Sequence, residues 1–284
     1  GGTNPINLFP PRVVHRHNAL FVMTPPQPVS TFSVDVDRAA YSNIRRMIQQ
    51  GTFPPKDAVR IEEMINYFDY DYPTPDAQTP SPLRVSYEQA PAPWNTTHYL
   101  LRIGLKTKPL DLSNTPASHL VFLIDVSGSM MDYNKLPLLK SSLKLLLQNL
   151  KPQDKVSIVT YASGTQVALE PTSVREREKI EKVLDGLEAG GATSGERGIQ
   201  LAYEQAHKAF IKGGNNRIIL ATDGDFNVGI NNPNDLKAFI EKQREGGVYL
   251  SVLGFGMGNY RDDMSETLAD SGNGNYAYID NLTE

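Results

Sequence analysis

Three oxygen-bearing side chains occupy alternate positions at the end of an apolar run. The run covers residues 119–124, and Asp125, Ser127 and Ser129 follow it. In extended backbone, alternate residues point to the same side, so the carboxylate and the two hydroxyls can converge on one cation. Gly128 allows a tight turn between the serines and leaves room for a close approach. Because every donor is an oxygen, the set favours a hard cation, Mg²⁺, Mn²⁺ or Ca²⁺, over zinc or copper.

The apolar run before Asp125 has the length and branched side chains of a strand buried on both faces, as in parallel sheets. From residue 119 onward, strand-like and helix-like segments alternate, which is typical of a doubly wound α/β fold. The predicted strands cover 119–125, 155–161, 165–169, 216–222, 248–254 and 275–279, and the predicted helices cover 135–150, 173–186, 195–211, 233–244 and 260–271. Asn134 is the expected cap of the first of these helices.

These elements predict a doubly wound, mostly parallel six-stranded sheet of the Rossmann-like kind over residues 113–284. The tight turn at 163–164 makes the strand that follows it antiparallel, at one edge. The loops after the parallel strands meet at the carboxyl edge of such a sheet, which is the usual binding location. The Asp125 loop is therefore expected at that edge.

The chain ahead of the sheet is expected to form an arm and a smaller domain. Residues 1–29 are rich in proline and favour an extended arm or linker. Residues 30–112 favour an accessory α+β domain. Its expected elements are a strand at 31–36, a helix that Gly51 ends, a second helix from Pro54 with an apolar stripe between Val59 and Phe68, and strands at about 83–89 and 98–106.

The bulk composition excludes several classes of protein. The 284 residues carry a net charge of −4, which gives no reason to expect binding to nucleic acid or to an anionic membrane surface. No apolar run reaches the roughly 18 residues that a bilayer-spanning helix needs. The chain has no cysteine, which is compatible with an extracellular location or with the cytosol.

The pattern Asp-x-Ser-x-Ser at 125–129 resembles the metal-ion-dependent adhesion site of von Willebrand factor A domains. The resemblance implies two further ligands on separate loops, Thr193 in a Gly-Gly-Ala-Thr segment and Asp223 in Thr-Asp-Gly. It also implies that an Asp or Glu carboxylate of a partner protein completes the metal shell. Few direct anionic contacts would leave a bound Mg²⁺, Mn²⁺ or Ca²⁺ able to accept that carboxylate.

The N-terminal part carries a second resemblance. Residues 28–46 and 60–68 resemble the N-terminal region of a bacterial family of von Willebrand A lipoproteins. This implies an exported protein in the cell envelope, tethered through a lipidated cysteine near the N-terminus. That cysteine is absent from this sequence and is expected to have been removed together with the leader. The resemblance also implies a further C-terminal region. The segment from Asp280 is expected to begin a final helix of the A domain.

Further residues are candidates for a supporting role at the predicted metal site. Asp225 is expected either to support the metal ligands or to be an ordinary surface acid. Five large side chains are candidates for a rim that contacts the partner, and packing residues otherwise: Met130, Met131, Tyr161, Phe226 and Tyr260.

The residues favour a binding module that is not an enzyme, and other hypotheses compete with it. Small polar residues at strand ends often only cap helices. A metal-dependent phosphohydrolase could use Asp125 as nucleophile, but the position for its second aspartate holds Ser127, and no histidine or lysine base stands in a motif. A cytosolic partner of an ATPase, as in chelatase-type A domains, is a third hypothesis. A dinucleotide site is excluded because no Gly-x-Gly-x-x-Gly follows the first strand.

Overall fold

The computed structural model describes residues 28–29, 38–76, 81–109, 114–193, 197–224, 232–256 and 262–282. Contacts divide the chain into two compact units, one of Gly1–Tyr67 with Ala117–Glu284 and one of Phe68–Pro116. The predicted strand at 31–36 and nearly all of the predicted arm lie outside the described residues. A domain boundary at residue 113 stays a prediction, but the helices before Tyr67 group with the sheet.

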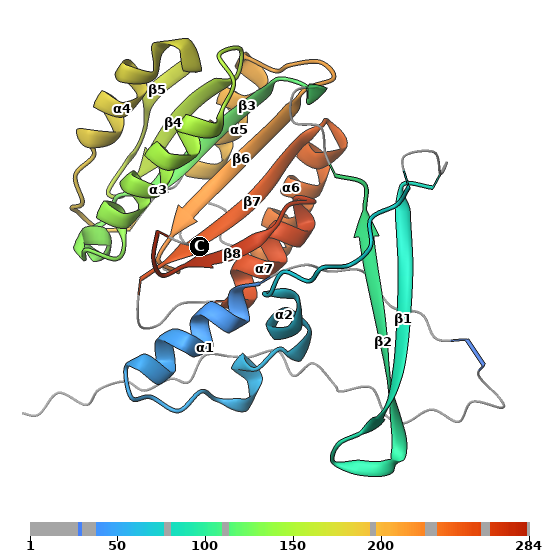
Figure 1. The fold of residues 1–284 in the computed structure, drawn as a ribbon. Helices are drawn as coiled ribbons and strands as arrows, with labels where there is room; N and C mark the ends of the chain where they lie inside the picture. The colour runs from blue at the N-terminus through green and yellow to red at the C-terminus, as the bar shows by residue number, and fades with distance from the viewer. Residues whose placement is uncertain are drawn as a thin grey trace, which may run out of the picture. The chain divides into compact units, whose positions relative to one another are not determined.

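A six-stranded sheet forms the centre of the larger unit (Figure 1). The strands are β3 (Ser118–Asp125), β4 (Lys155–Tyr161), β5 (Thr165–Ser173), β6 (Asn215–Thr222), β7 (Val248–Phe255) and β8 (Tyr276–Ile279). Their order is β5-β4-β3-β6-β7-β8, and only the pairing of β5 with β4 is antiparallel. The predicted doubly wound, mostly parallel sheet is therefore confirmed.

Helices cover the two faces of this sheet, and each face has its own apolar core. The helices that follow β3 are α3 (Leu136–Asn149), α4 (Arg177–Asp185), α5 (Gly198–Lys208), α6 (Pro233–Glu245) and α7 (Asp262–Ser271). Leucines of α3 and α4 form one core, and apolar residues of α5, α6 and α7 form the other. Strand β3 contributes Phe122 and Ile124 to the core beneath α3 and α4. It contributes Val121 and Leu123 to the core beneath α5, α6 and α7. Burying each such side chain contributes about 1.5–3 kcal/mol, so the central strand is rigidly held.

Two N-terminal helices belong to the same unit. Helix α1 (Ala39–Gln49) ends before Gly51, as predicted, and packs against β8. Arg45 on α1 donates to both carboxylate oxygens of Asp280, at 2.7 and 3.2 Å. Asp280 was expected to begin a further helix; its carboxylate here accepts hydrogen bonds from α1.

The second predicted N-terminal helix was wrong in its extent and in its buried face. A short turn, η1 (Lys56–Ala58), is followed by α2 (Ile61–Asn66), and its apolar residues Ile61 and Ile65 are 65% and 53% exposed. The buried side is polar. Glu63 is 3% exposed and accepts the backbone N–H of Ala40 at 2.8 Å, and Arg60 pairs with Glu266 of α7 at 2.8 Å. Hydrogen bonds and ion pairs with α1 and α7 determine which face of α2 is buried. The spacing of apolar residues within the helix does not reveal these contacts.

The smaller unit contains a two-stranded antiparallel hairpin of β1 (Leu83–Ala92) and β2 (Asn95–Thr107). Both strands were predicted, but they extend into the segment expected to be their loop. The apolar side chains of the hairpin are exposed; Tyr87 is 81% and Leu101 is 61% exposed. In the part of the chain that the structure describes, no helix is long and apolar enough to cross a membrane.

Candidate functional site

Asp125 ends β3 and is fully buried. Its Oδ1 accepts the backbone N–H of Ser127 at 2.8 Å, whereas its Oδ2 has no hydrogen-bond partner among the described residues. Burial raises the pKa of Asp125 to about 6, and the nearby charge of Asp223 adds to the rise, against the hydrogen bonds from Ser127 and a smaller contribution from the hydroxyl of Tyr161. A buried carboxylate oxygen without a donor is costly. It is therefore suited to accept a cation.

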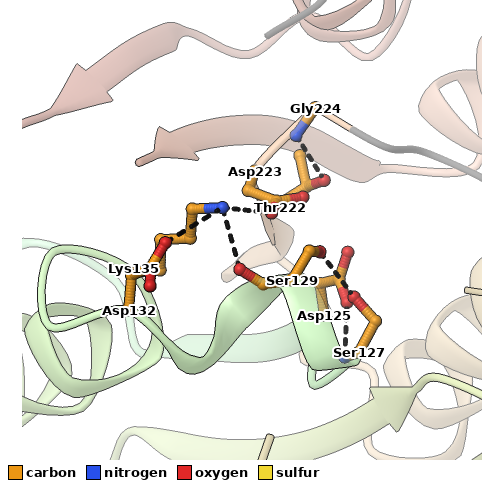
Figure 2. Close-up of polar contacts among 8 residues, drawn as sticks. All are labelled: Asp125, Ser127, Ser129, Asp132, Lys135, Thr222, Asp223 and Gly224. Carbon is orange, nitrogen blue, oxygen red and sulfur yellow. Dashed lines mark hydrogen bonds and ion pairs between the residues drawn. The ribbon is translucent and has the colours of Figure 1, made fainter. Parts of the chain in front are cut away.

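The two serines lie beside this carboxylate, where the turn η3 (Gly128–Met131) begins (Figure 2). The hydroxyl oxygens of Ser127 and Ser129 are 3.0 Å apart. Ser127 is buried and Ser129 is exposed. The three side chains that alternate in sequence thus come together, and the cluster reaches solvent at Ser129.

The loop before α5 is held against this turn by backbone hydrogen bonds. Gly128 donates its N–H to the carbonyl of Gly191 at 2.9 Å, and Gly190 donates to Val126 at 2.8 Å. Gly191 has φ +81°, a conformation that favours glycine. Thr193, two residues further on, is therefore carried to the same edge of the sheet, where it is half-buried.

Asp223 follows β6 and reaches the site through a residue that the sequence analysis missed. The ammonium of Lys135 donates to Asp223 Oδ2 and to the carbonyl of Ser129, both at 2.8 Å, and lies 3.9 Å from Asp132 Oδ2 (Figure 2). The side chains of Lys135 and Asp223 are only 10% and 5% exposed. Lys135 therefore connects the loop after β3 to the loop after β6.

The position of Lys135 at the start of α3 creates a need for a negatively charged partner. The residue stands at the N-cap of α3, where the helix dipole disfavours a positive charge, so a lysine there needs a compensating acid. The expected cap by Asn134 was wrong, because Lys135 holds that position, and no side chain of the described residues caps the helix there. The stem of Lys135 lies against Gly256, which has φ +89°, and a Cβ at Gly256 would collide with it.

Burial excludes two of the five candidates for the rim, which instead take the alternative role of packing residues. Met130 and Tyr161 are both 0% exposed and have no surface to offer a partner. The turn η3 directs Met130 into the core beneath α3, and Tyr161 at the end of β4 packs into the core on the other face. Met131 is 67% exposed and stays a candidate. Asp225, Phe226 and Tyr260 lie outside the described residues.

The donors at this edge fit a hard divalent ion. Within the described ranges, no group of three or more His, Cys, Asp and Glu side chains is arranged to hold a metal. The predicted set is of another kind, with two carboxylates and three hydroxyls. Oxygen donors of mixed charge, together with water, match the preferences of Mg²⁺, Mn²⁺ and Ca²⁺.

Comparison with known proteins gives matches over both parts of the chain. A family model described as von Willebrand factor type A domain matches residues 119–284, and one described as von Willebrand factor matches residues 14–102. Uncharacterized protein YfbK of Escherichia coli (strain K12) is 50% identical over 262 residues, which cover 90% of this chain and 46% of that protein.

Inter-alpha-trypsin inhibitor heavy chain H4 of Bos taurus is 31% identical over 156 residues, which cover 52% of this chain and 17% of that protein. The chain thus spans less than half the length of either relative. Among solved structures, it is similar to the conserved hypothetical protein BatB from Bacteroides thetaiotaomicron, with a TM-score of 0.49, 20% identity, and coverage of 58% of this chain and 91% of that one. The family model extends from the start of β3 to the end of the chain and spans more than half of the sequence. The chain therefore belongs to the von Willebrand factor type A domain family.

Proposed function

We propose that this chain is a protein-binding module whose binding depends on a divalent metal ion and that it is not an enzyme. The observation that carries the proposal is the buried Asp125 Oδ2, which finds no hydrogen-bond partner in the part of the chain that the structure describes, beside two hydroxyls 3.0 Å apart. Family membership supports the general role, since von Willebrand factor A domains mediate interactions between proteins. The metal and the chemistry of the partner are the specific part of the proposal.

The ion would be held by oxygens from three loops of one sheet edge. The proposed ligands, direct or through water, are Asp125, Ser127, Ser129, Thr193 and Asp223. We propose Mg²⁺ as the ion, with Mn²⁺ or Ca²⁺ as substitutes. When bound, it would supply a Lewis-acidic position for an outside oxygen. The exposed side of the cluster, at Ser129, is where an Asp or Glu carboxylate of a partner would enter.

Titration calorimetry tests the metal directly. Native protein should bind Mg²⁺ or Mn²⁺, and Asp125→Ala should lose this binding while keeping the native circular dichroism spectrum. The matched control is Asp185→Ala, which removes a 60% exposed acid that pairs with Lys144. This control should bind like native protein. Equal binding by native protein and Asp125→Ala would overturn the metal assignment.

The partner is tested in the same way. Immobilised native protein should retain proteins from a bacterial envelope extract in the presence of Mg²⁺ and release them when a chelator is added. Asp125→Ala should retain none of them. Retention that is unchanged by the chelator would exclude a carboxylate held by the metal.

We also propose that the full-length protein acts at the bacterial cell envelope through a lipid anchor. The support is the resemblance of residues 28–46 and 60–68 to the N-terminal region of bacterial von Willebrand A lipoproteins. Fractionation of cells that express the full-length protein should recover it with the membranes. Recovery in the cytosol would favour the partner of a cytosolic ATPase instead.

A further inference from the structure

Lys135 places a positive charge inside the cluster of proposed metal ligands. Its ammonium lies 2.8 Å from Asp223 Oδ2 and 2.8 Å from the carbonyl of Ser129, and both charged side chains are nearly buried. A buried ion pair of this kind is weakly screened by salt. The third acid near the ammonium, Asp132, is 3.9 Å away and 71% exposed, so solvent screens it more strongly.

The surrounding residues fix the side chain of Lys135 along its whole length. Its stem lies where the Cβ of any residue other than glycine would stand at position 256. The backbone of Gly256 has φ +89°, which also favours glycine. Gly256, directly after β7, therefore leaves room for the lysine stem, and two hydrogen-bond acceptors fix its end, the carbonyl of Ser129 and the carboxylate of Asp223.

The charge balance of the cluster depends on this lysine. Among the described residues, Asp125 and Asp223 bring two negative charges and Lys135 removes one of them. With a divalent ion, the cluster then carries one net positive charge. Without Lys135, the same loaded cluster would be neutral. A positive cluster attracts a carboxylate more strongly than a neutral one, but it binds the metal more weakly.

We propose that Lys135 tunes the site: it neutralises Asp223, weakens metal binding, and leaves the loaded site positively charged for capture of an acidic side chain. This inference rests on the proposed metal-dependent function. It makes Lys135 a positioning and tuning residue that acts through Asp223, not a ligand of the metal. Neutralising it should shift the affinities for the metal and for a carboxylate in opposite directions.

The first test measures Mn²⁺ binding by calorimetry for native protein, Lys135→Met and Lys135→Gln. Both variants should bind Mn²⁺ at least about tenfold more tightly than native protein, because a nearby positive charge has been removed. The matched control is Lys144→Met on the same helix, whose ammonium pairs with Asp185 away from the cluster. It should bind like native protein.

The second test uses acetate as the carboxylate probe. Acetate should tighten Mn²⁺ binding in native protein and tighten it less in Lys135→Met. An equal or larger effect of acetate in the variant would overturn carboxylate capture by the positive site, as would no effect in native protein.

Thermal unfolding provides a readout that needs no partner. Without metal, Lys135→Met should unfold at a lower temperature than native protein, and Mn²⁺ should raise its midpoint more.

The outcomes separate this inference from the proposed function. If native protein and Lys135→Met bind Mn²⁺ equally, the tuning role is wrong and the metal site stands. If no variant and no native sample binds Mn²⁺, the proposed function fails and the inference fails with it. Binding by Lys135→Met alone would support the competition between lysine and metal while contradicting metal dependence of the native protein.

Discussion

The two oxygens of Asp125 lie in different environments, and this difference has a cost. One oxygen accepts the N–H of Ser127, and the other is buried without a hydrogen-bond partner among the described residues. The pKa of about 6 shows that folding disfavours the charged form, chiefly through burial. A group whose pKa rises on folding contributes stability that is complete below its unfolded value of 3.8 and is lost as the pH rises through about 6.

We therefore predict that Asp125→Asn stabilises the protein when a chelator is present at pH 7, by up to about 3 kcal/mol. The advantage should disappear near pH 4, where the native carboxylate is protonated. Chemical unfolding in a chelator at both pH values measures the effect. Asp154→Ala is the contrasting variant. Its carboxylate accepts two backbone N–H groups at 2.7 Å, so its loss should destabilise the protein. A less stable Asp125→Asn at pH 7 would contradict the argument.

His119, at the other end of β3, should give a pH dependence of opposite sign. Its Nε2 lies 2.9 Å from the hydroxyl of Ser157, and its pKa is lowered from 6.5 to about 4 by burial and then by the charge of Lys155, against a backbone contact with Ala206. The unfolded chain binds a proton near pH 6.5 and the folded chain does not. Stability is therefore present above that pH and is lost as the pH falls toward 4.

The corresponding variant is His119→Gln, compared with native protein between pH 7 and pH 4.5. Native protein should lose up to about 3 kcal/mol more than the variant over this range, measured by urea unfolding. His207→Gln, at an exposed position, should follow native protein. Parallel losses in native protein and His119→Gln would place the acid sensitivity elsewhere.

Among the elements, the residues that directly follow β3, β6 and β7 depend on one another. Lys135 lies at the start of α3, pairs with the loop after β6, and fills the space beside Gly256 after β7. We predict that Gly256→Ala destabilises the protein more than Gly51→Ala does. Both positions have positive φ, which costs about 1–2 kcal/mol for alanine, but the space around Gly51 is open.

A double-mutant cycle isolates the steric part of this cost. Truncation in Lys135→Ala removes the atoms that a Cβ at position 256 would meet. In that background, Gly256→Ala should cost only as much as Gly51→Ala, as measured by chemical unfolding. If the cost of Gly256→Ala were the same in both backgrounds, the side chain of Lys135 would not be what restricts that position.

The elements differ in how far local sequence predicts them. Strands such as β3 and β4 are buried on both faces, so their apolar runs identify them almost to the residue. The alternation of Asp125, Ser127 and Ser129 likewise predicts that these three side chains lie together, as they do in the structure. Lys135 was missed because its role is a contact with Asp223, 88 residues away. Local patterns carry no information about which distant charge a buried lysine meets.

The same limit applies to the N-terminal helices. The apolar residues of α2 predicted the wrong buried face, because Glu63 and Arg60 find partners on α1 and α7. The burial of Met130 and Tyr161 follows from the turn and the strand register, and neither was evident from residue type. Sequence patterns thus predicted the sheet and the proximity of Asp125, Ser127 and Ser129, whereas their role as metal ligands stays a prediction. Charge pairs between distant elements account for Lys135 and for the buried face of α2.

Considering the molecule as a whole, nearly buried ion pairs connect the residues before Tyr67 to the rest of the larger unit. Arg60 pairs with Glu266 on α7 and with Glu63, and these side chains are 4–11% exposed. In the smaller unit, Arg102 pairs with Glu88 at 2.7 Å, but these side chains are 54% and 67% exposed. The two sets of ion pairs should therefore contribute very differently to stability.

We predict that Arg60→Ala lowers the free energy of unfolding by about 3–5 kcal/mol, because it leaves two buried carboxylates without their shared cation. Arg102→Ala should cost less than about 1 kcal/mol, since water already solvates that pair. Urea unfolding of both variants, followed by far-ultraviolet circular dichroism, compares their free energies of unfolding. A partial rescue of Arg60→Ala by Glu266→Gln would locate the loss in the uncompensated charge. A small effect of Arg60→Ala alone would mean that α1 and α2 are held to the sheet by Arg45 and apolar packing instead.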